Sequence, residues 1–205
     1  GGIGGCSSNT RGLLGGGNVG DGHTNVIQYI TIASAGDATD FGNLSVARAM
    51  TASFSSTTRG VWAGGDPAGA STSNVMDYVT IDSTGNAADF GDLSAARSLA
   101  AGASSATRGL ICNGNESGGA VNKIEYVTIG STGNTTDFGD ATVTARARGA
   151  VSSTIRAVIA GGFAASTDTM DYVTIASTGN ATDFGNLTSS RASISGASNS
   201  HGGLS

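Results

Sequence analysis

Few side chains in this chain of 205 residues carry groups that could do nucleophilic, acid–base or metal chemistry. The two histidines, His23 and His201, lie in glycine-rich stretches, and neither belongs to a pattern that could activate one of the many serines. Cys6 and Cys112 stand far apart, and the chain has no Cys-x-x-Cys or paired-histidine spacing for a metal. Glutamate occurs only twice, so a hydrolase built on paired carboxylates would rest on aspartate alone. The sequence therefore predicts no catalytic residue, no enzyme activity and no cofactor.

The best candidate for metal binding is a calcium site within residues 82–92. Asp82, Asn86, Asp89 and Asp92 supply oxygen ligands at the short spacing that suits a hard cation. The spacing is not that of an EF-hand loop, and the counterparts of Asp82 in three similar segments are Ala or Gly. Turns in which Asn and Asp side chains bond to their own backbone explain these residues equally well. Calcium is therefore an alternative beside a purely structural role for this turn.

The composition excludes several classes of protein. Glycine supplies 34 residues and charged residues only 12%, about half of the usual ~25%. The net charge is −5 and lysine occurs once, which argues against binding to nucleic acid or anionic membranes. The chain contains no run of ~18 apolar residues, so no membrane-spanning segment is predicted. Helix-favouring residues are scarce, so a helical bundle is also excluded.

An internal repeat dominates the chain, with tyrosines spaced by 49, 48 and 46 residues. Each copy has a Tyr-containing segment, an Asp-Phe-Gly triplet, an Arg, and a second Arg ten or eleven residues later. The columns are Tyr29, Tyr78, Tyr126 and Tyr172; Asp40, Asp89, Asp137 and Asp183; Phe41, Phe90, Phe138 and Phe184; Arg48, Arg97, Arg146 and Arg191; and Arg11, Arg59, Arg108 and Arg156, with His201 in the last copy. The repeats span about 1–47, 48–96, 97–145 and 146–190, and 191–205 begins a fifth within one repeat domain.

Each repeat predicts four short strands. The first follows the first Arg and is rich in small residues, as in 98–105, and the second runs from the second Arg into a glycine pair, as in 59–65. The third contains the Tyr among alternating β-branched residues, and the fourth contains the Asp-Phe-Gly triplet. A Ser-Thr-Gly-Asn turn such as 83–86 joins the third strand to the fourth. The loops between the second and third strands differ most, at 18–24, 66–73, 115–121 and 163–167.

Four strands in about 48 residues are typical of the blade of a β-propeller. The Arg that opens a strand, the Gly-Gly pair and the aromatic residues of the last two strands resemble the kelch-type blade over essentially the whole chain. Phe replaces the usual Trp of the last strand. The close similarity of the copies and their Gly, Ser and Thr content resemble the kelch-like repeats of phage fibres and other virion-associated proteins. This resemblance implies an all-β, kelch-like propeller of about four blades with one surplus terminal strand.

The repeated columns are expected to be structural. The phenylalanines should wedge between neighbouring blades, and the tyrosines should pack with a polar tip exposed. The Asp and Arg columns lie eight or nine residues apart, so we expect Asp–Arg pairs, or bonds from Arg to carbonyls, within or between blades. The alternative is an anion-binding ring of Arg around a central channel.

The ends of the chain do not match whole blades. Residues 1–8 form a first strand, and 192–200 repeat that strand a fifth time before a fifth second strand begins at 201–205. Five first strands therefore accompany four sets of the other three. The chain is then part of a larger propeller, or donates its surplus strand to another subunit in a fibre, or overlaps one strand at closure.

Function follows less directly than fold. The first hypothesis is a non-enzymatic structural or adhesive module of an extracellular fibre or virion, such as a tail-fibre, decoration or receptor-binding component. Its partners would be further copies or other fibre subunits, and a cell-surface glycan or protein bound by the variable loops. The alternative is a propeller lectin or enzyme with a ligand site at the channel mouth, near 66–67 or 115–116. An intracellular protein-binding adaptor is a third possibility.

Overall fold

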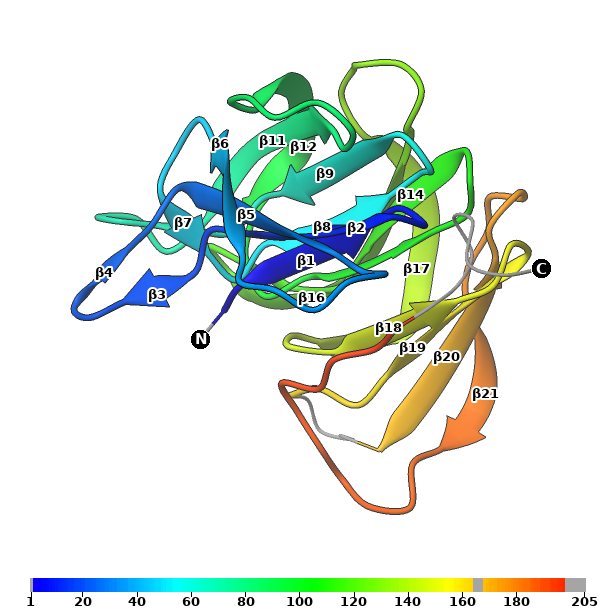
Figure 1. The fold of residues 1–205 in the computed structure, drawn as a ribbon. Coiled ribbons are helices and arrows are strands. Elements are labelled where there is room, and N and C mark those ends of the chain that lie inside the picture. The colour runs from blue at the N-terminus through cyan, green and yellow to red at the C-terminus, as the bar shows by residue number, and fades with distance from the viewer. Residues whose placement is uncertain (1, 164–167, 198–205) are drawn as a thin grey trace.

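The structure is a computed structural model that describes residues 2–163 and 168–197. Over these residues the chain folds into antiparallel β-sheets and contains no helix, so the all-β prediction is confirmed. Four sheets, numbered I to IV along the chain, each contain four main strands (Figure 1). Within the described part of the chain no helix could span a membrane.

The main strands pair in sequence order within each sheet, as predicted from the repeat. Sheet I contains β1 (Gly4–Ser7), β2 (Arg11–Gly15), β5 (Val26–Thr31) and β6 (Thr39–Asn43). Sheet II contains β8 (Ala52–Ser55), β9 (Arg59–Ala63), β11 (Ser73–Thr80) and β12 (Ala88–Arg97). Sheet III contains β13 (Ala101–Ser104), β14 (Arg108–Cys112), β16 (Gly119–Thr128) and β17 (Thr136–Ala145). Sheet IV contains β18 (Gly149–Ser152), β19 (Arg156–Ala160), β20 (Thr169–Thr174) and β21 (Thr182–Asn186).

Short strands sit at the variable loops that join the second and third strands of sheets I, II and III. They are β3 (Asn18–Val19), which pairs with β4 (Gly22–His23), β10 (Asp66–Pro67), which pairs with β7 (Arg48–Ala49), and β15 (Asn115–Glu116), which pairs with the start of β16. Because β7 precedes sheet II and β10 follows β9, the β7–β10 pair ties this loop to the segment that enters its sheet.

A β-bulge sits at the Asp-Phe-Gly triplet of every sheet. In sheet II, Met76 pairs with Gly91 and Asp77 with Asp89, so Phe90 is the extra residue on β12. The same register shift follows Ile27, Ile124 and Met170. A bulge re-aims the side chain that it leaves unpaired. The Phe column therefore points out of its own sheet and toward the next one.

The hydrophobic core lies between sheets rather than within any one of them. Phe41 packs with Trp62, Val79 and Ile81 between sheets I and II. Phe90 and Phe138 occupy the same place between sheets II and III and between III and IV. These three phenylalanines are 1–2% exposed, as predicted, but Phe184 of sheet IV is 48% exposed. Its position is equivalent, but no further sheet covers it among the described residues.

The first strands of the four sheets lie next to one another in the order β1, β8, β13 and β18. The predicted fifth first strand, 192–200, does not form over its described residues, 192–197, which carry no strand assignment. They nevertheless lie against β18, where a Cβ on Gly196 would meet the Ala150 carbonyl oxygen at 2.1 Å. The reason is simple: each true first strand pairs with the strand that follows it in its own sheet, and 192–197 have no such partner among the described residues. Residues 198–200 and the start of the predicted strand at 201–205, with His201, lie outside the described residues.

Candidate functional site

One buried ion pair stands at each junction between sheets. Arg48, in the segment that joins sheets I and II, contacts Asp77 of β11 at 3.0 Å, and neither side chain is exposed. Arg97 contacts Glu125 of β16 at 2.8 Å in the equivalent place. Each carboxylate is the residue before the Tyr of its strand. The preceding connection adds further bonds, since the backbone N–H and hydroxyl of Ser45 both donate to Asp77.

These arginines stay buried because the carboxylates compensate them. Burial lowers the pKa of Arg48, and the charge and hydrogen bond of Asp77 oppose that shift. Arg48 also donates to the Trp62 carbonyl. Truncating one partner of such a pair leaves an uncompensated buried charge. The arrangement therefore fixes one sheet on the next and commits the Arg48 and Arg97 charges to carboxylates.

The expected pairs between the Asp-Phe-Gly aspartates and the first Arg column do not form among the described residues. The aspartates are exposed, and Asp89 and Asp183 each accept a hydrogen bond from the backbone N–H two residues later. The bulge explains the error, because it turns this edge of the strand away from the buried face. The true acceptors, Asp77, Glu125 and Asp171, form a second column at the same repeat spacing, with Gln28 in sheet I.

Arg146 is a second correction. In sheet III the residue that pairs where Arg97 pairs in sheet II is Ala145, because this copy places its Arg one position later. Arg146 is exposed and donates to Asn115. Arg148, which belongs to neither predicted column, supplies the buried guanidinium and pairs with Asp171. The signal was available: Arg148 is the one Arg outside the columns, in the one copy whose spacing slips.

The second Arg column stacks on the tyrosine of its own sheet and donates to a carbonyl of the next sheet. The guanidinium carbon of Arg59 lies 4.6 Å from the centre of the Tyr78 ring, and Tyr78 meets Phe90 edge-on at 5.8 Å. Arg59 also donates to the carbonyl of Ile129 in sheet III. Arg11 and Arg108 donate in the same way to Ile81 and Ile175 of the following sheets. Arg to carbonyl bonds between sheets were expected, but the stacking on Tyr was not.

The candidate calcium residues are spread over two junctions. Asn86 reaches sheet I, where its Oδ1 accepts the backbone N–H of Asn43. Asp92 faces sheet III and donates its backbone N–H to Asn134. Asp89 Oδ1 bonds to Gly91. The described residues contain no group of three His, Cys, Asp or Glu side chains that could hold a metal. The turn asparagines thus join sheets in this structure.

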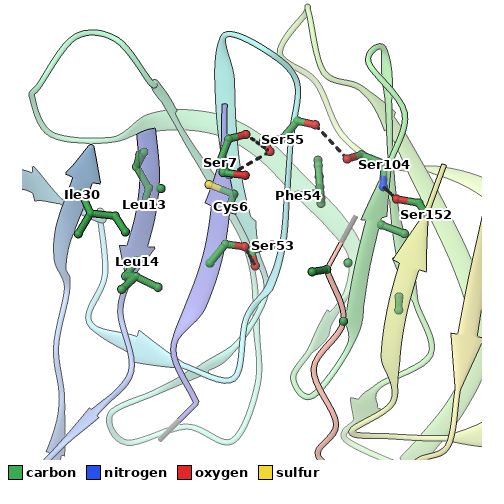
Figure 2. Close-up of a pocket in the computed structure, with 17 residues that line it drawn as sticks. Cys6, Ser7, Leu13, Leu14, Ile30, Ser53, Phe54, Ser55, Ser104 and Ser152 are labelled. Atoms are coloured by element: carbon green, nitrogen blue, oxygen red, sulfur yellow. Dashed lines mark hydrogen bonds between the residues drawn. The ribbon is translucent and has the colours of Figure 1, made fainter. Parts of the chain in front are cut away.

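One concavity runs along the first strands. This groove of about 370 Å³ is lined by residues of β1, β8, β13 and β18, and Figure 2 shows Leu14 and Ile30 on the side away from Ser104 and Ser152. Its serines are bonded to neighbouring backbones: Ser55 donates to the Ser7 carbonyl at 2.8 Å, and Ser104 to the Ser55 carbonyl at 2.9 Å. Hydroxyls committed in this way cross-link strands and are poor candidates for nucleophiles.

The cysteines and His23 are further groups that the sequence singled out. Burial raises the pKa of Cys6 and of Cys112 to about 12, so both thiols stay protonated at neutral pH. The cysteines are not bonded to each other. His23 lies in β4, and its Nε2 is 4.0 Å from Asp66 in the neighbouring loop.

The candidate site residues therefore hold neighbouring sheets together, and nearly the same contacts recur at all three junctions between sheets. The anion-binding ring is not favoured, because Arg48, Arg97 and Arg148 are neutralised by carboxylates. No protein-family model matches the chain, and no curated protein matches it.

Proposed function

We propose that this chain is a kelch-like propeller module with a non-enzymatic, structural and adhesive role in an extracellular fibre or virion. One observation carries the proposal: the repeated Arg, Tyr, Phe and Asn side chains pack and bond where neighbouring sheets meet. The variable loops are then the surface that differs between copies. Rigid scaffolds with variable loops are the common design of binding proteins.

The variable loops are well suited to bind a partner. Their bases are anchored, since Asn115 forms a β-bridge with Ser98 and Phe163 with Arg146. Their tips are exposed, as at 69–71 and 117–118. The loops also reach toward one another, because His23 of the first approaches Asp66 of the second. A cell-surface glycan or protein is the proposed partner of this edge.

The test is binding to a panel of immobilised oligosaccharides and to intact cells, with the fluorescently labelled chain. The key variant replaces 66–72 with the shorter loop 115–119. The control is Ile155→Asp, an exposed residue in the turn before β19. This turn precedes a second strand, whereas the variable loops follow the second strands. We expect the loop exchange to weaken binding by about tenfold or more at an unchanged melting temperature, and the control to leave both unchanged.

Two results would contradict the proposal. The first is binding that does not respond to exchange of any variable loop. The second is release of a shortened oligosaccharide, detected by mass spectrometry, which would favour the propeller enzyme with a site at the channel mouth.

A further inference from the structure

The three junctions between sheets share one set of contacts. On the leading side, a bulged Phe, an Arg and the apolar residues around them face forward. On the receiving side, three positions are filled by Trp62, Val79 and Ile81 in sheet II, by Ile111, Val127 and Ile129 in sheet III, and by Ile159, Val173 and Ile175 in sheet IV. All nine receiving residues are at most 4% exposed.

Over the described residues, sheet IV presents the leading half of this junction with no further sheet against it, although residues 192–197 lie along β18. We call Val151, Arg156, Met170, Phe184 and Leu187 the phenylalanine flank. Phe184 is 48% exposed and Val151 43%, whereas Phe54, the counterpart of Val151 in sheet II, is 4% exposed. Arg156 stacks on Tyr172 as its counterparts do on their tyrosines, but no carbonyl acceptor accompanies its guanidinium among the described residues.

Sheet I presents the receiving half. We call Gly12, Leu14, Ile30, Ile32 and Gly36 the isoleucine flank. Leu14, Ile30 and Ile32 occupy the positions of Trp62, Val79 and Ile81, yet they are 46%, 41% and 54% exposed. Gly12 corresponds to Gly109, which makes room for Phe54 at its own junction. Figure 2 shows Leu14 and Ile30 on the side of the groove away from Ser104 and Ser152.

The glycine of each Asp-Phe-Gly triplet shows the same asymmetry. A Cβ on Gly42, Gly91 or Gly139 would meet the turn of the next sheet at 2.3–2.5 Å, and that turn donates a backbone N–H to the adjacent Phe carbonyl at 2.7 Å. A Cβ on Gly185 would meet only the end of Met170, at 4.0 Å. Gly185 thus has room for a turn that the described residues do not supply. Gly36 lies in the turn of sheet I that is equivalent to the turns of Gly85, Gly133 and Gly179, which donate to the phenylalanine carbonyls at the internal junctions.

We infer that the phenylalanine flank of one copy binds the isoleucine flank of a second copy, head to tail. This inference rests on the proposed structural role and deepens it. Arg156 would then donate to the Ile32 carbonyl of the second copy, and Gly36 would donate to the Phe184 carbonyl, as their counterparts do at each internal junction. The contact is heterologous, so it closes into a ring or extends into a filament.

Residues 192–197 occupy the position that the first strand of the second copy would take. The N–H of Met50 donates to Gly2, that of Leu99 to Met50, that of Ala147 to Leu99, and that of Ser193 to Ala147. Ser193 therefore continues a series in which each first strand attaches to the one before.

The N-terminal segment carries the residue that fits this position. Ile194 covers Gly149 and Gly161, and its counterpart at the N-terminus is Ile3, which is 57% exposed. Thr51, Ala100 and Arg148 stand at this position in the other copies. The second copy would place Gly2 and Ile3 where Ser193 and Ile194 lie, so 192–197 act as an internal competitor that docking displaces.

Analytical ultracentrifugation of the full chain, at about 1 to 200 µM, tests the inference. The variants are Phe184→Asp on one flank, Ile32→Asp on the other, and the chain ended at Arg191. Ile155→Asp, 67% exposed and outside both flanks, is the matched control. Circular dichroism checks that each variant is folded, and Phe184→Ser and Ile32→Ser replace any variant that is not.

We expect the wild type to exceed its monomer mass of 19.9 kDa as concentration rises. Each flank variant should associate about tenfold or more weakly, the control should match the wild type, and removal of 192–205 should strengthen association. An equal mixture of the two flank variants should form dimers and nothing larger, because each keeps the flank that the other has lost.

The inference is overturned if the wild type and the shortened chain are both monomeric over this range, if oligomers persist in both flank variants, or if the mixture stays monomeric. The glycan and cell-binding assay, repeated with the monomeric Phe184→Asp variant, distinguishes a failure of this inference from a failure of the proposed function. Binding through the variable loops would survive a failed head-to-tail contact, and a failed loop test would leave the oligomer intact.

Discussion

Asp77→Asn removes one negative charge from a place where no water can replace it. The Asp77 and Arg48 side chains are both 0% exposed and lie 3.0 Å apart. The substitution keeps the shape of the residue but leaves the Arg48 guanidinium buried without a counter-charge, which typically costs about 3–5 kcal/mol. The amide also replaces one of the two oxygens that accept bonds from Ser45.

This loss is large compared with the stability of a typical domain, about 5–15 kcal/mol. Each kcal/mol shifts the melting temperature of a chain of this size by about 2–4 °C, so we expect a fall of about 6–20 °C. Equilibrium unfolding in urea, followed by circular dichroism, would measure the free energy directly, and an unchanged m-value would show that the unfolded states are comparable.

Asp40→Asn is the matched control, because it makes the same chemical change at an exposed aspartate of the Asp-Phe-Gly column. It should alter stability by no more than about 0.5 kcal/mol. The double variant Arg48→Met, Asp77→Leu should lose less than Asp77→Asn alone, since no charge is left unpaired. A loss below about 1 kcal/mol for Asp77→Asn, or one equal to that of Asp40→Asn, would refute the assignment of the buried carboxylate column.

Two further predictions concern the junction and the thiols. Gly91→Ala and Gly185→Ala both place a side chain at a positive φ, +137° and +125°, but only Gly91 has the turn of the next sheet at 2.5 Å, so Gly91→Ala should cost about 2 kcal/mol more. Equal losses in thermal unfolding would contradict that contact. Burial raises the pKa of Cys112 from 9.0 to about 12, so the folded state keeps a proton that the unfolded chain loses above pH 9. Stability is thus full below pH 9 and falls toward pH 12, by about 1.4 kcal/mol per pH unit for this thiol; urea unfolding of Cys112→Ala should show a shallower fall, and an identical slope would contradict it.

The repeat allowed the strand plan and the aromatic packing to be predicted from the sequence. β-Branched alternation and turn residues mark the third strand and the turn that follows it, and these signals are local. Phe41, Phe90 and Phe138 are buried as predicted, because a large side chain among so many small ones has few other places to go. A closed propeller stays a prediction.

The pairing of the charged columns could not be predicted in the same way. In a repeat, every column recurs with the same period. Periodicity alone therefore does not say which acidic column contacts which Arg column. Asp89 and Asp77 recur equally regularly, and only the bulge at Phe90 decides between them. A bulge adds one residue to one strand, and the sequence marks it only by the glycine at 91, whose φ is positive. Arg148 reaches its site from the segment just before β18 and is marked in the sequence only by the shifted Arg spacing of its copy.

Sheets I and IV each present one outer face that no other described sheet covers. The polarity of the side chains on these two faces indicates whether they are adapted to solvent. Repeat arrays that end in water usually carry polar residues on their outer faces. Here the last copies keep the apolar code: Leu14 and Ile32 remain apolar on one flank and Phe184 on the other, although each is about half exposed. Exposed apolar residues scattered singly need no explanation, but these occupy the positions that are buried at all three internal junctions. The two flanks are therefore better explained as halves of a fourth junction than as surfaces adapted to solvent.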